Sequence, residues 1–391
     1  MTRHDALIVG SGPAGSALAA SLAAAGARVL LVERARHPRP KACAEYASPR
    51  IVEELERVGL SRRAWSDDAV PLDGMRLHAG GHTIRIAYAD HSGPRQAWGV
   101  DRRSFDERLA RHAAGAGAEL REATRAVSLI HDGARVRGAR LRDVETGREA
   151  SVAADWVIGA DGVRSGVARL LGVERPVRFP RRLGLVAHFS GVAGLTDHGE
   201  MHVGRGSYVG LAPTPGGELN VGMALPWRDG GRSGATQFQA AIDALPTVAR
   251  RLAGSTRIGP IRGAAPIGHR VRSVAGPGWL LIGDAAGFVD PFTGEGIHRA
   301  LRSARAASAA LRAGGDVAAA YRAERRRAFA AKAALSWLVQ GFLAVPWLLE
   351  LAVERLEARP TAALRLGSAL GDCRPATDAL SPLALAEVLR P

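Results

Sequence analysis

Short apolar runs that stop at glycines and acids recur along this chain. Residues 6–9 are consecutive apolar residues, and an Ala- and Leu-rich run over 14–25 follows directly after turn glycines. This pattern predicts a buried parallel strand followed by a helix. Further apolar runs over 28–32, 156–160 and 278–282 end in the same way, at an acid or a Gly-Asp pair. Strands that alternate with helices predict a parallel sheet of the α/β class.

The remaining segments carry weaker patterns. Loose alternation over 72–88 and short strands with many turns over 176–270 predict a second, mostly antiparallel sheet. Turn signals at Asp132-Gly133 and Thr146-Gly147 predict a small antiparallel meander over 119–154. Helical patterns cover residues 50–58, 100–113 and 294–311. The apolar stretch 335–353 is broken by Pro346, which predicts two short helices that pack over the second sheet or touch a lipid surface.

The first turn has the spacing G-x-G-x-x-G. Gly10 permits the tight turn, Gly12 lets the backbone approach a pyrophosphate, and Gly15 lets the helix pack close on the strand. Glu33 follows the second strand, about 20 residues past the motif, where an acid binds the ribose hydroxyls of a dinucleotide. The alternative is a glycine-rich turn with an ordinary surface Glu. The strand, turn and helix around the motif favour a dinucleotide site.

Two later corners resemble the first. Asp161 ends one apolar strand, and Gly283 with Asp284 ends another. Ligands bind at the carboxyl ends of parallel strands, so the three corners are expected to converge on one extended molecule. Residues 290–298 form a second glycine-bearing entry into a helix, whose amides would stabilise negative charge on a reduced cofactor ring. A simple helix cap by Thr293 is the alternative.

Composition narrows the class of protein. The chain has 391 residues, 47% of them apolar, and a formal net charge of +15. Lys41 and Lys332 are its only lysines, and the arginines are scattered, so we expect no nucleic-acid partner. Cys43 and Cys373 have no metal-ligand spacing, so no disulfide scaffold and no metal site are expected. The N-terminus passes straight into the first strand, so we expect no signal segment and a cytoplasmic location, with peripheral membrane contact through 335–353 left open.

The three strand-end motifs together match the pattern of a known enzyme superfamily. The glycine motif with Glu33, the Asp161-Gly162 corner and the Gly283-Asp284 corner resemble, in order and spacing, the three fingerprints of FAD-dependent enzymes of the para-hydroxybenzoate hydroxylase superfamily. Within it, Lys41-x-Cys43 and residues 100–106 and 291–297 are similar to the geranylgeranyl-reductase-like branch. The resemblance spans most of the chain.

This resemblance implies FAD as the cofactor. Arg102 would contact the flavin nucleotide, Asp284 the ribityl–phosphate region, and residues 291–297 the isoalloxazine ring. Cys43 is either a small buried apolar residue or lies beside the cofactor. The residues expected to bind the cofactor are Gly10, Gly12, Pro13, Ala14, Gly15, Glu33, Arg34, Cys43, Arg102, Asp161, Gly283, Asp284, Pro291, Gly294, Glu295, Gly296 and Ile297.

The expected fold is an α/β, Rossmann-like FAD-binding domain that is discontinuous over 1–70, 99–175 and 271–320. A mostly antiparallel substrate-binding sheet over 71–98 and 176–270 is inserted into it. C-terminal helices over 321–391 complete the chain.

The substrate sheet departs from the branch pattern. Reductases of this branch carry Tyr-x-Trp-x-Phe-Pro, whereas this chain has Tyr208-Val-Gly210-Leu-Ala212-Pro213, so two large aromatic residues are replaced by small ones. The reductases' Cys-Gly pair is Cys43-Ala44 here. The Trp-x-Trp-x-Ile-Pro signature of related halogenases is absent from the sequence.

These departures lead us to expect an NAD(P)H-driven monooxygenase that uses O2 to hydroxylate or epoxidise an apolar aromatic, polyketide or lipid-like small molecule. Either NADPH or NADH would be the electron donor, and Cys43 and Tyr208 are the candidate catalytic residues. The alternative is a flavin-dependent reductase of C=C bonds in an isoprenoid or lipid, with Cys43 or Tyr46 as proton donor. A third hypothesis is an FAD-binding protein whose flavin is structural. His188, His269 and His298 are candidate bases only because imidazole titrates near neutral pH. The alternative for each is an ordinary hydrogen-bonded side chain.

Overall fold

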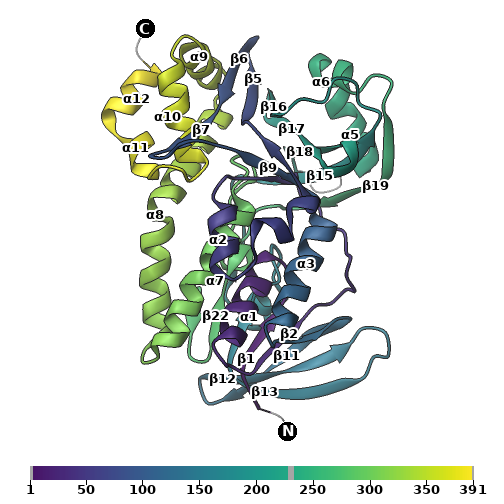
Figure 1. The fold of residues 1–391 in the computed structure, drawn as a ribbon, viewed down its shortest axis with the longest axis vertical. Helices are drawn as coiled ribbons and strands as arrows, with labels where there is room; N and C mark the ends of the chain where they lie inside the picture. Colours follow the sequence, from purple (N-terminus) through teal and green to yellow (C-terminus); the bar gives the residue numbers. More distant parts are fainter. Residues whose placement is uncertain (1–2, 228–232, 390–391) are drawn as a thin grey trace.

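Parallel strands form the centre of the lower sheet in Figure 1. The computed structural model describes residues 3–227 and 233–389. The sheet has eight strands, and β10, β2, β1, β13 and β22 are parallel neighbours in that order. Their bounds are β1 Arg3–Val9, β2 Val29–Val32, β10 Glu119–Arg121, β13 Glu149–Gly159 and β22 Trp279–Leu281. The four apolar runs of the sequence thus become adjacent strands, which confirms the expected α/β class.

The predicted meander extends this sheet on one side. Strands β11 (Thr124–Asp132) and β12 (Arg135–Asp143) pair antiparallel with each other, and β12 pairs antiparallel with β13. β22 pairs with the last residues of β13, beyond those that pair with β12, and β21 (Ala275–Gly276) pairs antiparallel with β22. β13 therefore serves both the meander and the parallel centre.

Helices cover one face of the parallel strands. α1 (Pro13–Ala24) lies between α3 (Arg102–Gly115) and α7 (Gly296–Ala313) and contacts both. Alternate residues of β1 face two separate cores: Ala6 and Ile8 pack with these helices, and Leu7 and Val9 pack on the opposite side. Burial on both faces explains why the strand is apolar throughout. The shorter elements of this half are α2 Ile51–Arg57, α4 Gly166–Leu170, and the 3-10 helices η1 Arg62–Ala64, η2 Ser66–Asp68 and η4 Gly283–Ala286.

The upper sheet has seven strands in the order β19-β15-β18-β17-β16-β5-β6. All of its pairs are antiparallel except β16 with β5, which joins two segments that are distant in the sequence. Its bounds are β5 Met75–Ala79, β6 His82–Ile86, β15 Arg182–Ser190, β16 Gly199–Gly204, β17 Ser207–Thr214, β18 Glu218–Pro226 and β19 Thr256–Ala264. Helices α5 (Gly234–Asp243) and α6 (Pro246–Arg251) pack on one face through Phe238, Ile242 and Val248.

Short paired strands connect the two sheets. They are β3 Tyr46–Ala47, β4 Ala69–Leu72 and β9 Ala97–Val100 in one sheet, β7 Tyr88–Asp90 with β8 Gly93–Arg95, and β14 Glu174–Arg175 with β20 Arg270–Val271. The 3-10 turn η3 (Pro215–Gly217) joins β17 to β18. These short strands bring the edge of the upper sheet over the carboxyl ends of the parallel strands.

The C-terminal helices differ from the expectation. The sequence pattern predicts two short helices over 335–353, but α8 is one long helix, Val317–Ala344, that crosses the expected boundary at residue 320. The expected break is present: α9 (Pro346–Glu357) begins at Pro346, which fits the first turn of a helix because it lacks an N–H. α9 packs on β5 and β6, and α10 Pro360–Leu370, α11 Ala376–Leu380 and α12 Pro382–Leu389 follow.

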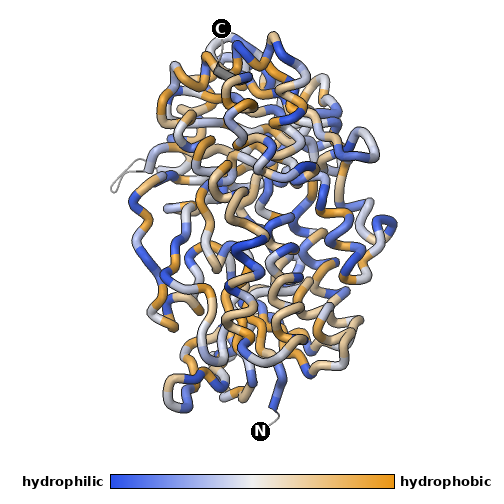
Figure 2. The backbone as a smooth tube through the Cα atoms, turned by 90° about the vertical axis from the view of Figure 1, so that its left-hand side faces the viewer, coloured by the Kyte–Doolittle hydropathy of each residue, from blue (hydrophilic) through white to orange (hydrophobic). Residues whose placement is uncertain are grey.

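Apolar and polar segments alternate along these C-terminal helices at the top of Figure 2. Leu343, Leu349 and Val353 pack in one core with Leu77 and Ile84 of the upper sheet. Within the described residues, no single helix has the length and apolar character needed to cross a bilayer. Only α8 and α9 taken together pass that test, and they are bent by 111° relative to each other.

Candidate active site

The first turn has the geometry of a phosphate cradle. Gly10 has a φ of +104°, and a Cβ there would lie 2.6 Å from the carbonyl oxygen of Ala160. A Cβ on Gly15 would lie 1.8 Å from the carbonyl oxygen of Gly10, so the helix packs on the turn with no room for a side chain. At Gly12, however, a Cβ would meet only the Arg39 guanidinium, at 3.8 Å. No side chain caps α1 at Gly12, so the first amides of the helix are left for an anion.

Glu33 lies beside this turn and is held in place. Its carboxylate accepts hydrogen bonds from the backbone N–H and the hydroxyl of Ser11, at 3.2 and 3.1 Å. Burial opposes its ionisation, but the Arg39 guanidinium, 3.1 Å away, and the backbone donors lower the pKa of Glu33. The Arg34 side chain is exposed, and its expected contact with the cofactor stays a prediction. Arg39 lies beside the turn. Nothing in the sequence distinguishes Arg39 from the other arginines of this loop.

The third corner meets the first. A Cβ on Gly283 would lie 2.9 Å from the Cβ of Ala14, and both residues line one cavity with Pro13 and Asp284. The Lys41 ammonium lies 4.0 Å from the Asp284 carboxylate. An acid, a lysine and free helix amides therefore lie around the space that a dinucleotide would occupy.

Asp161 is oriented differently. Its carboxylate accepts hydrogen bonds from the Ser165 hydroxyl and, at 3.1 Å, from the backbone N–H of Val167, at the start of α4. Burial raises the pKa of Asp161. Gly162 and Val163, rather than Asp161, line the cavity. The expected contact of Asp161 with the cofactor stays a prediction.

The cavity encloses about 1420 Å³, part of it open to solvent. One wall consists of the cradle, the Gly283 corner and the turn before α7, including Pro291, Gly294, Gly296 and Ile297. The opposite wall is the inner face of the upper sheet. Glu295, expected at the isoalloxazine ring, faces away from the cavity wall: its carboxylate lies 3.0 Å from the Lys332 ammonium of α8.

Cys43 lies in the wall of this cavity. Its sulfur accepts hydrogen bonds from the Arg102 guanidinium at 3.2 Å and from the backbone N–H of Glu45 at 3.4 Å. Arg102 is buried and pairs with Asp106 at 2.8 Å. The two possibilities for Cys43 thus resolve toward a position beside the cavity, with a positive charge next to the sulfur.

A buried polar cluster lies behind Cys43. Glu45 is 2% exposed and has a φ of 57°, which is unusual for a residue other than glycine. Its carboxylate contacts His188 Nε2 at 2.7 Å and accepts a hydrogen bond from Asn220 Nδ2 at 2.9 Å. The hydrogen bond to Glu45 raises the pKa of His188, although burial opposes this. The sequence pattern did not single out Glu45 as a site residue or Asn220 at all, because their partners are far away along the chain.

The other two candidate histidines lie elsewhere. His269 contacts the carbonyl oxygen of Ala285 at 3.2 Å, and His298 pairs with Asp372 at 2.9 Å. Neither lines the cavity.

The Tyr208 ring forms part of the far wall. Its hydroxyl donates a hydrogen bond of 2.6 Å to Asp290, which also pairs with Arg182 at 2.6 Å. Burial and the Asp290 charge raise the pKa of Tyr208 well above its ordinary value. The Tyr208 hydroxyl is therefore anchored, while its ring packs edge-on against Phe292 with centroids 5.0 Å apart. Thr293 does not cap α7, which begins after Glu295 without a side-chain cap.

Comparison with known proteins identifies the family of this chain and its cofactor. Residues 3–336 match the family described as FAD binding domain. This chain belongs to that family. It is an FAD-dependent oxidoreductase of the para-hydroxybenzoate hydroxylase superfamily, as the resemblance predicted. The glycine cradle, the carboxylates and the cavity fit an extended FAD, whose pyrophosphate Gly12 and the first turn of α1 would bind.

Two relatives of this FAD-binding protein are named as reductases. The menaquinone reductase of Mycolicibacterium smegmatis is 33% identical over 326 residues, which cover 80% of this chain and 78% of the relative. The digeranylgeranylglycerophospholipid reductase of Methanosarcina acetivorans is 33% identical over 316 residues, which cover 78% and 74%.

Solved structures share the fold. A geranylgeranyl bacteriochlorophyll reductase-like protein from Thermoplasma acidophilum superposes with a TM-score of 0.80 at 23% identity, over 94% of this chain and 96% of its own. A flavin-dependent brominase superposes with a TM-score of 0.82 at 22% identity, over 99% of both chains. At this identity the likeness concerns the fold alone.

Proposed function

We propose that this FAD-dependent oxidoreductase reduces C=C bonds of an isoprenoid lipid. The names of the relatives at 33% identity support this alternative over the monooxygenase that the sequence pattern placed first. The observation that carries the proposal is the cavity: it is mostly apolar, and it lies between the cofactor loops and the upper sheet.

The sheet wall of the cavity is lined by small residues that leave room for a long apolar chain. Gly184, Gly210, Ala212 and Gly222 lie on this wall. A Cβ on Gly210 would lie 3.4 Å from the Met201 methyl group, which is a flexible side-chain end. Replacement of the branch's aromatic residues by Gly210 and Ala212 thus widens the cavity and is compatible with a bulkier lipid.

Reduction of a C=C bond adds a hydride equivalent to one carbon and a proton to the other. FAD, when bound and reduced, supplies the hydride equivalent. The protein holds the proton: His188 is half-buried, its imidazole contacts Glu45, and Glu45 lines the cavity. We infer that protons pass from solvent through His188 and Glu45, with Cys43 beside the substrate. Tyr46, the other candidate proton donor, is less suited. Its hydroxyl is hydrogen-bonded to the Tyr88 hydroxyl at 2.8 Å, and burial raises the pKa of Tyr46.

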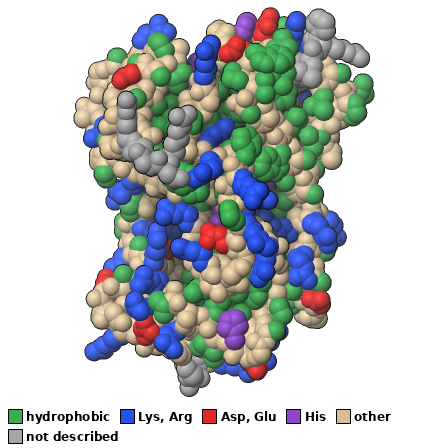
Figure 3. Space-filling view, turned by 180° about the vertical axis from the view of Figure 1, so that it is seen from behind, with side chains coloured by type: hydrophobic (Ala, Val, Ile, Leu, Met, Phe, Trp, Pro, Cys, Tyr) green, Lys and Arg blue, Asp and Glu red, His purple; other side chains and the backbone are tan. Residues whose placement is uncertain are grey.

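A lipid substrate requires access to a membrane surface. Phe179, Trp337 and Trp347 are 51%, 43% and 66% exposed, and the first two rings stack with centroids 6.5 Å apart. Residues 333–349 contain no charged side chain. Exposed Arg178 lies next to Phe179, and exposed Arg326 lies on α8. Figure 3 shows hydrophobic side chains gathered over the C-terminal helices next to a band of Lys and Arg. We propose that this face contacts an anionic bilayer from the cytoplasmic side.

The test is a single-turnover experiment without oxygen. The holoenzyme is reduced with NADPH or NADH and mixed with a menaquinone or with a geranylgeranyl lipid. Return of the oxidised flavin spectrum and a product that has gained hydrogen, measured by mass spectrometry, support the proposal. A product formed only after O2 is added, and carrying an added oxygen atom, assigns the protein as a monooxygenase. Turnover of neither kind, even after chemical reduction of the flavin, indicates a protein that only binds FAD.

Substitution of the cavity wall sharpens this test. Gly210→Phe fills the space against Met201 and is expected to lower kcat/KM for the lipid by at least roughly tenfold, with little effect on flavin reduction by the nicotinamide. Gly115→Phe is the matched control, because Gly115 is exposed near the end of α3 with open space around it. Equal activity of the two variants would place the lipid elsewhere.

A further inference from the structure

Two histidines and a glutamate gather on the outer face of the upper sheet. Among the described residues, His78, Glu200 and His202 form a group whose candidate ligand atoms all lie within 4.8 Å of one another. We propose that these three side chains bind one divalent transition-metal ion of borderline softness, such as Zn²⁺. The sequence patterns predict no metal, because they consider only the cysteines.

The backbone brings the three groups together. Glu200 and His202 are two residues apart on β16, so their side chains project from the same face of the sheet. His78 on β5 is the direct partner of His202 in the parallel register. Two residues spaced i, i+2 on one strand and a third opposite them on its neighbour give three ligands on one surface without any loop rearrangement.

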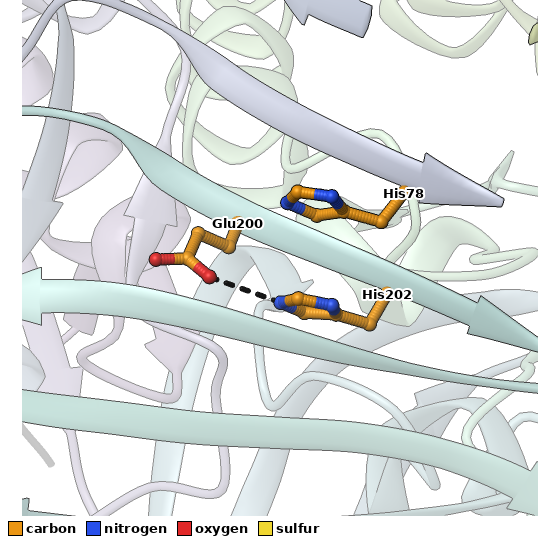
Figure 4. A group of neighbouring side chains, drawn as sticks. All are labelled: His78, Glu200 and His202. Atoms are coloured by element: carbon orange, nitrogen blue, oxygen red, sulfur yellow. Dashed lines mark hydrogen bonds and ion pairs between the residues drawn. The ribbon is translucent and has the colours of Figure 1, made fainter. Parts of the chain in front are cut away.

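Both rings point toward the carboxylate (Figure 4). His202 Nε2 lies 3.0 Å from Glu200, and the His78 and His202 rings stack with centroids 4.4 Å apart. The opposite nitrogen of each ring contacts a hydroxyl: Thr247 at 3.1 Å for His202 and Thr83 at 2.9 Å for His78. Such outer hydrogen bonds fix the tautomer and orientation of metal-binding imidazoles.

The electrostatics also suit a cation. Glu200 is largely buried, and its second oxygen accepts a hydrogen bond from Arg251 at 3.0 Å, which leaves the first oxygen to the histidines. The candidate ligand nitrogens of His78 and His202 lie within 4.8 Å of that carboxylate and of each other.

The groups are assembled but not yet at bonding distance. Zinc takes histidine nitrogens at about 2.0–2.1 Å, so the stacked rings must turn about their side-chain torsions to direct both lone pairs at one ion. Three protein ligands leave the fourth position to water, which the half-buried His78 admits. The ion would cross-link β5 to β16, where the two separate chain segments of the upper sheet meet. Met75 and Met201 of the same strands line the cavity, so the cross-link would brace the cavity wall.

Metal content and calorimetry test this site independently of the flavin reaction. The protein, freed of any affinity tag and treated with a chelator, is titrated with ZnCl2 at pH 7.5, and bound zinc is measured after gel filtration. We expect one zinc per chain. His202→Gln and His78→Gln should each weaken binding by at least about 100-fold, because they remove a direct ligand. His131→Gln, an exposed histidine of β11, is the matched control and should bind as the wild type does.

Two further measurements keep the outcome decisive. Zinc should raise the unfolding temperature of the wild type and of His131→Gln but not of His78→Gln. If His202→Gln does not fold, as judged by circular dichroism and FAD content, the variants His78→Gln and Glu200→Gln are compared with His131→Gln instead. Absence of stoichiometric zinc in the wild type, or equal binding by His78→Gln and His131→Gln, overturns the proposal.

Discussion

Gly12 and Gly15 of the cradle differ in what an added methyl group would meet. At Gly15 it would overlap the Gly10 carbonyl, whereas at Gly12 it would meet only the end of the Arg39 side chain. We expect Gly15→Ala to destabilise the fold, and Gly12→Ala to fold normally but lose FAD, because the methyl group fills the approach to the pyrophosphate. Thermal unfolding of the apo proteins and the bound flavin absorbance test this. FAD retention by Gly12→Ala would show that the pyrophosphate lies elsewhere.

The His188–Glu45 contact gives stability a defined pH dependence. The hydrogen bond raises the pKa of His188 above its ordinary 6.5, so the folded state favours the imidazolium. The stabilisation is complete below pH 6.5 and is lost as the pH rises through the raised pKa. His188→Gln should therefore lower the unfolding temperature more at pH 6 than at pH 9. His131→Gln is the control, and a difference that does not vary with pH would contradict the assignment.

Single residues were predictable from the sequence where their role is local. A position that needs a positive φ, such as Gly10, or a close approach of helix to backbone, such as Gly15, requires glycine. Both residues could therefore be recognised in the sequence. Glu45 and Asn220 form a hydrogen bond across 175 positions of sequence, and no local pattern indicates such a pair. Arg39, the ion-pair partner of the buried Glu33, was missed for the same reason.

At the scale of elements, α8 connects the turn before α7 to the C-terminal helices through one buried lysine. The Lys332 ammonium lies 3.0 Å from Glu295 and 3.1 Å from Asp372. Lys332→Met would remove the ammonium that these two buried carboxylates share and leave Glu295 to Arg299 and Asp372 to His298, at a cost of about 3 kcal/mol in unfolding free energy. FAD should also dissociate faster, because Glu295 directly precedes α7 in the turn that lines the cavity. Denaturant unfolding and flavin release measure both effects.

Arg327→Met is the matched control on the same helix. Its guanidinium pairs with Glu324 at 2.9 Å but is 76% exposed, and an exposed pair contributes less than about 1 kcal/mol. Equal losses of stability for the two variants would mean that the network around Lys332 is not what anchors α8.

Elements were predictable where the apolar period is clear, and less so in their pairing. The alternation over 72–88 indicates strands, and β5 and β6 are present there as an antiparallel pair. The parallel pairing of β5 with β16, however, depends on residues more than 100 positions away. Pro346 identified the break before α9, because proline suits the first turn of a helix. The start of α8 was missed, since a helix buried on several sides shows no clear apolar stripe.

At the scale of the whole molecule, three corners distant in the sequence converge because parallel strands end at one edge of a sheet. That rule made the convergence of these corners predictable from the sequence. No such rule places the residues on the inner face of the upper sheet, which closes the cavity. The sequence therefore indicated a substrate wall at Tyr208. It did not indicate that the buried acid Asp290 anchors Tyr208, or that the small residue Gly210 leaves open space in the cavity wall.

The whole-molecule charge and the exposed tryptophans predict how the protein meets a bilayer. It carries a net charge of +15, and Trp347 is 66% exposed on α9. We expect sedimentation with vesicles that contain phosphatidylglycerol, and weaker binding to neutral vesicles or at high salt, because screening weakens the attraction of the arginines. Trp347→Ala should lower the partition constant for vesicle binding about tenfold, since burying a large apolar side chain contributes about 1.5 kcal/mol.

Leu170→Ala is the control for this experiment, because Leu170 is also exposed but lies on α4, which packs on the lower sheet, far from α9 in the fold. Its binding should match that of the wild type. If Trp347→Ala and Leu170→Ala bind vesicles equally, the α8–α9 face is not the contact surface, and the exposed aromatic residues there need another partner. If lipid reduction in detergent is unchanged by Trp347→Ala while reduction in vesicles falls, the surface serves delivery of the substrate rather than the reaction itself.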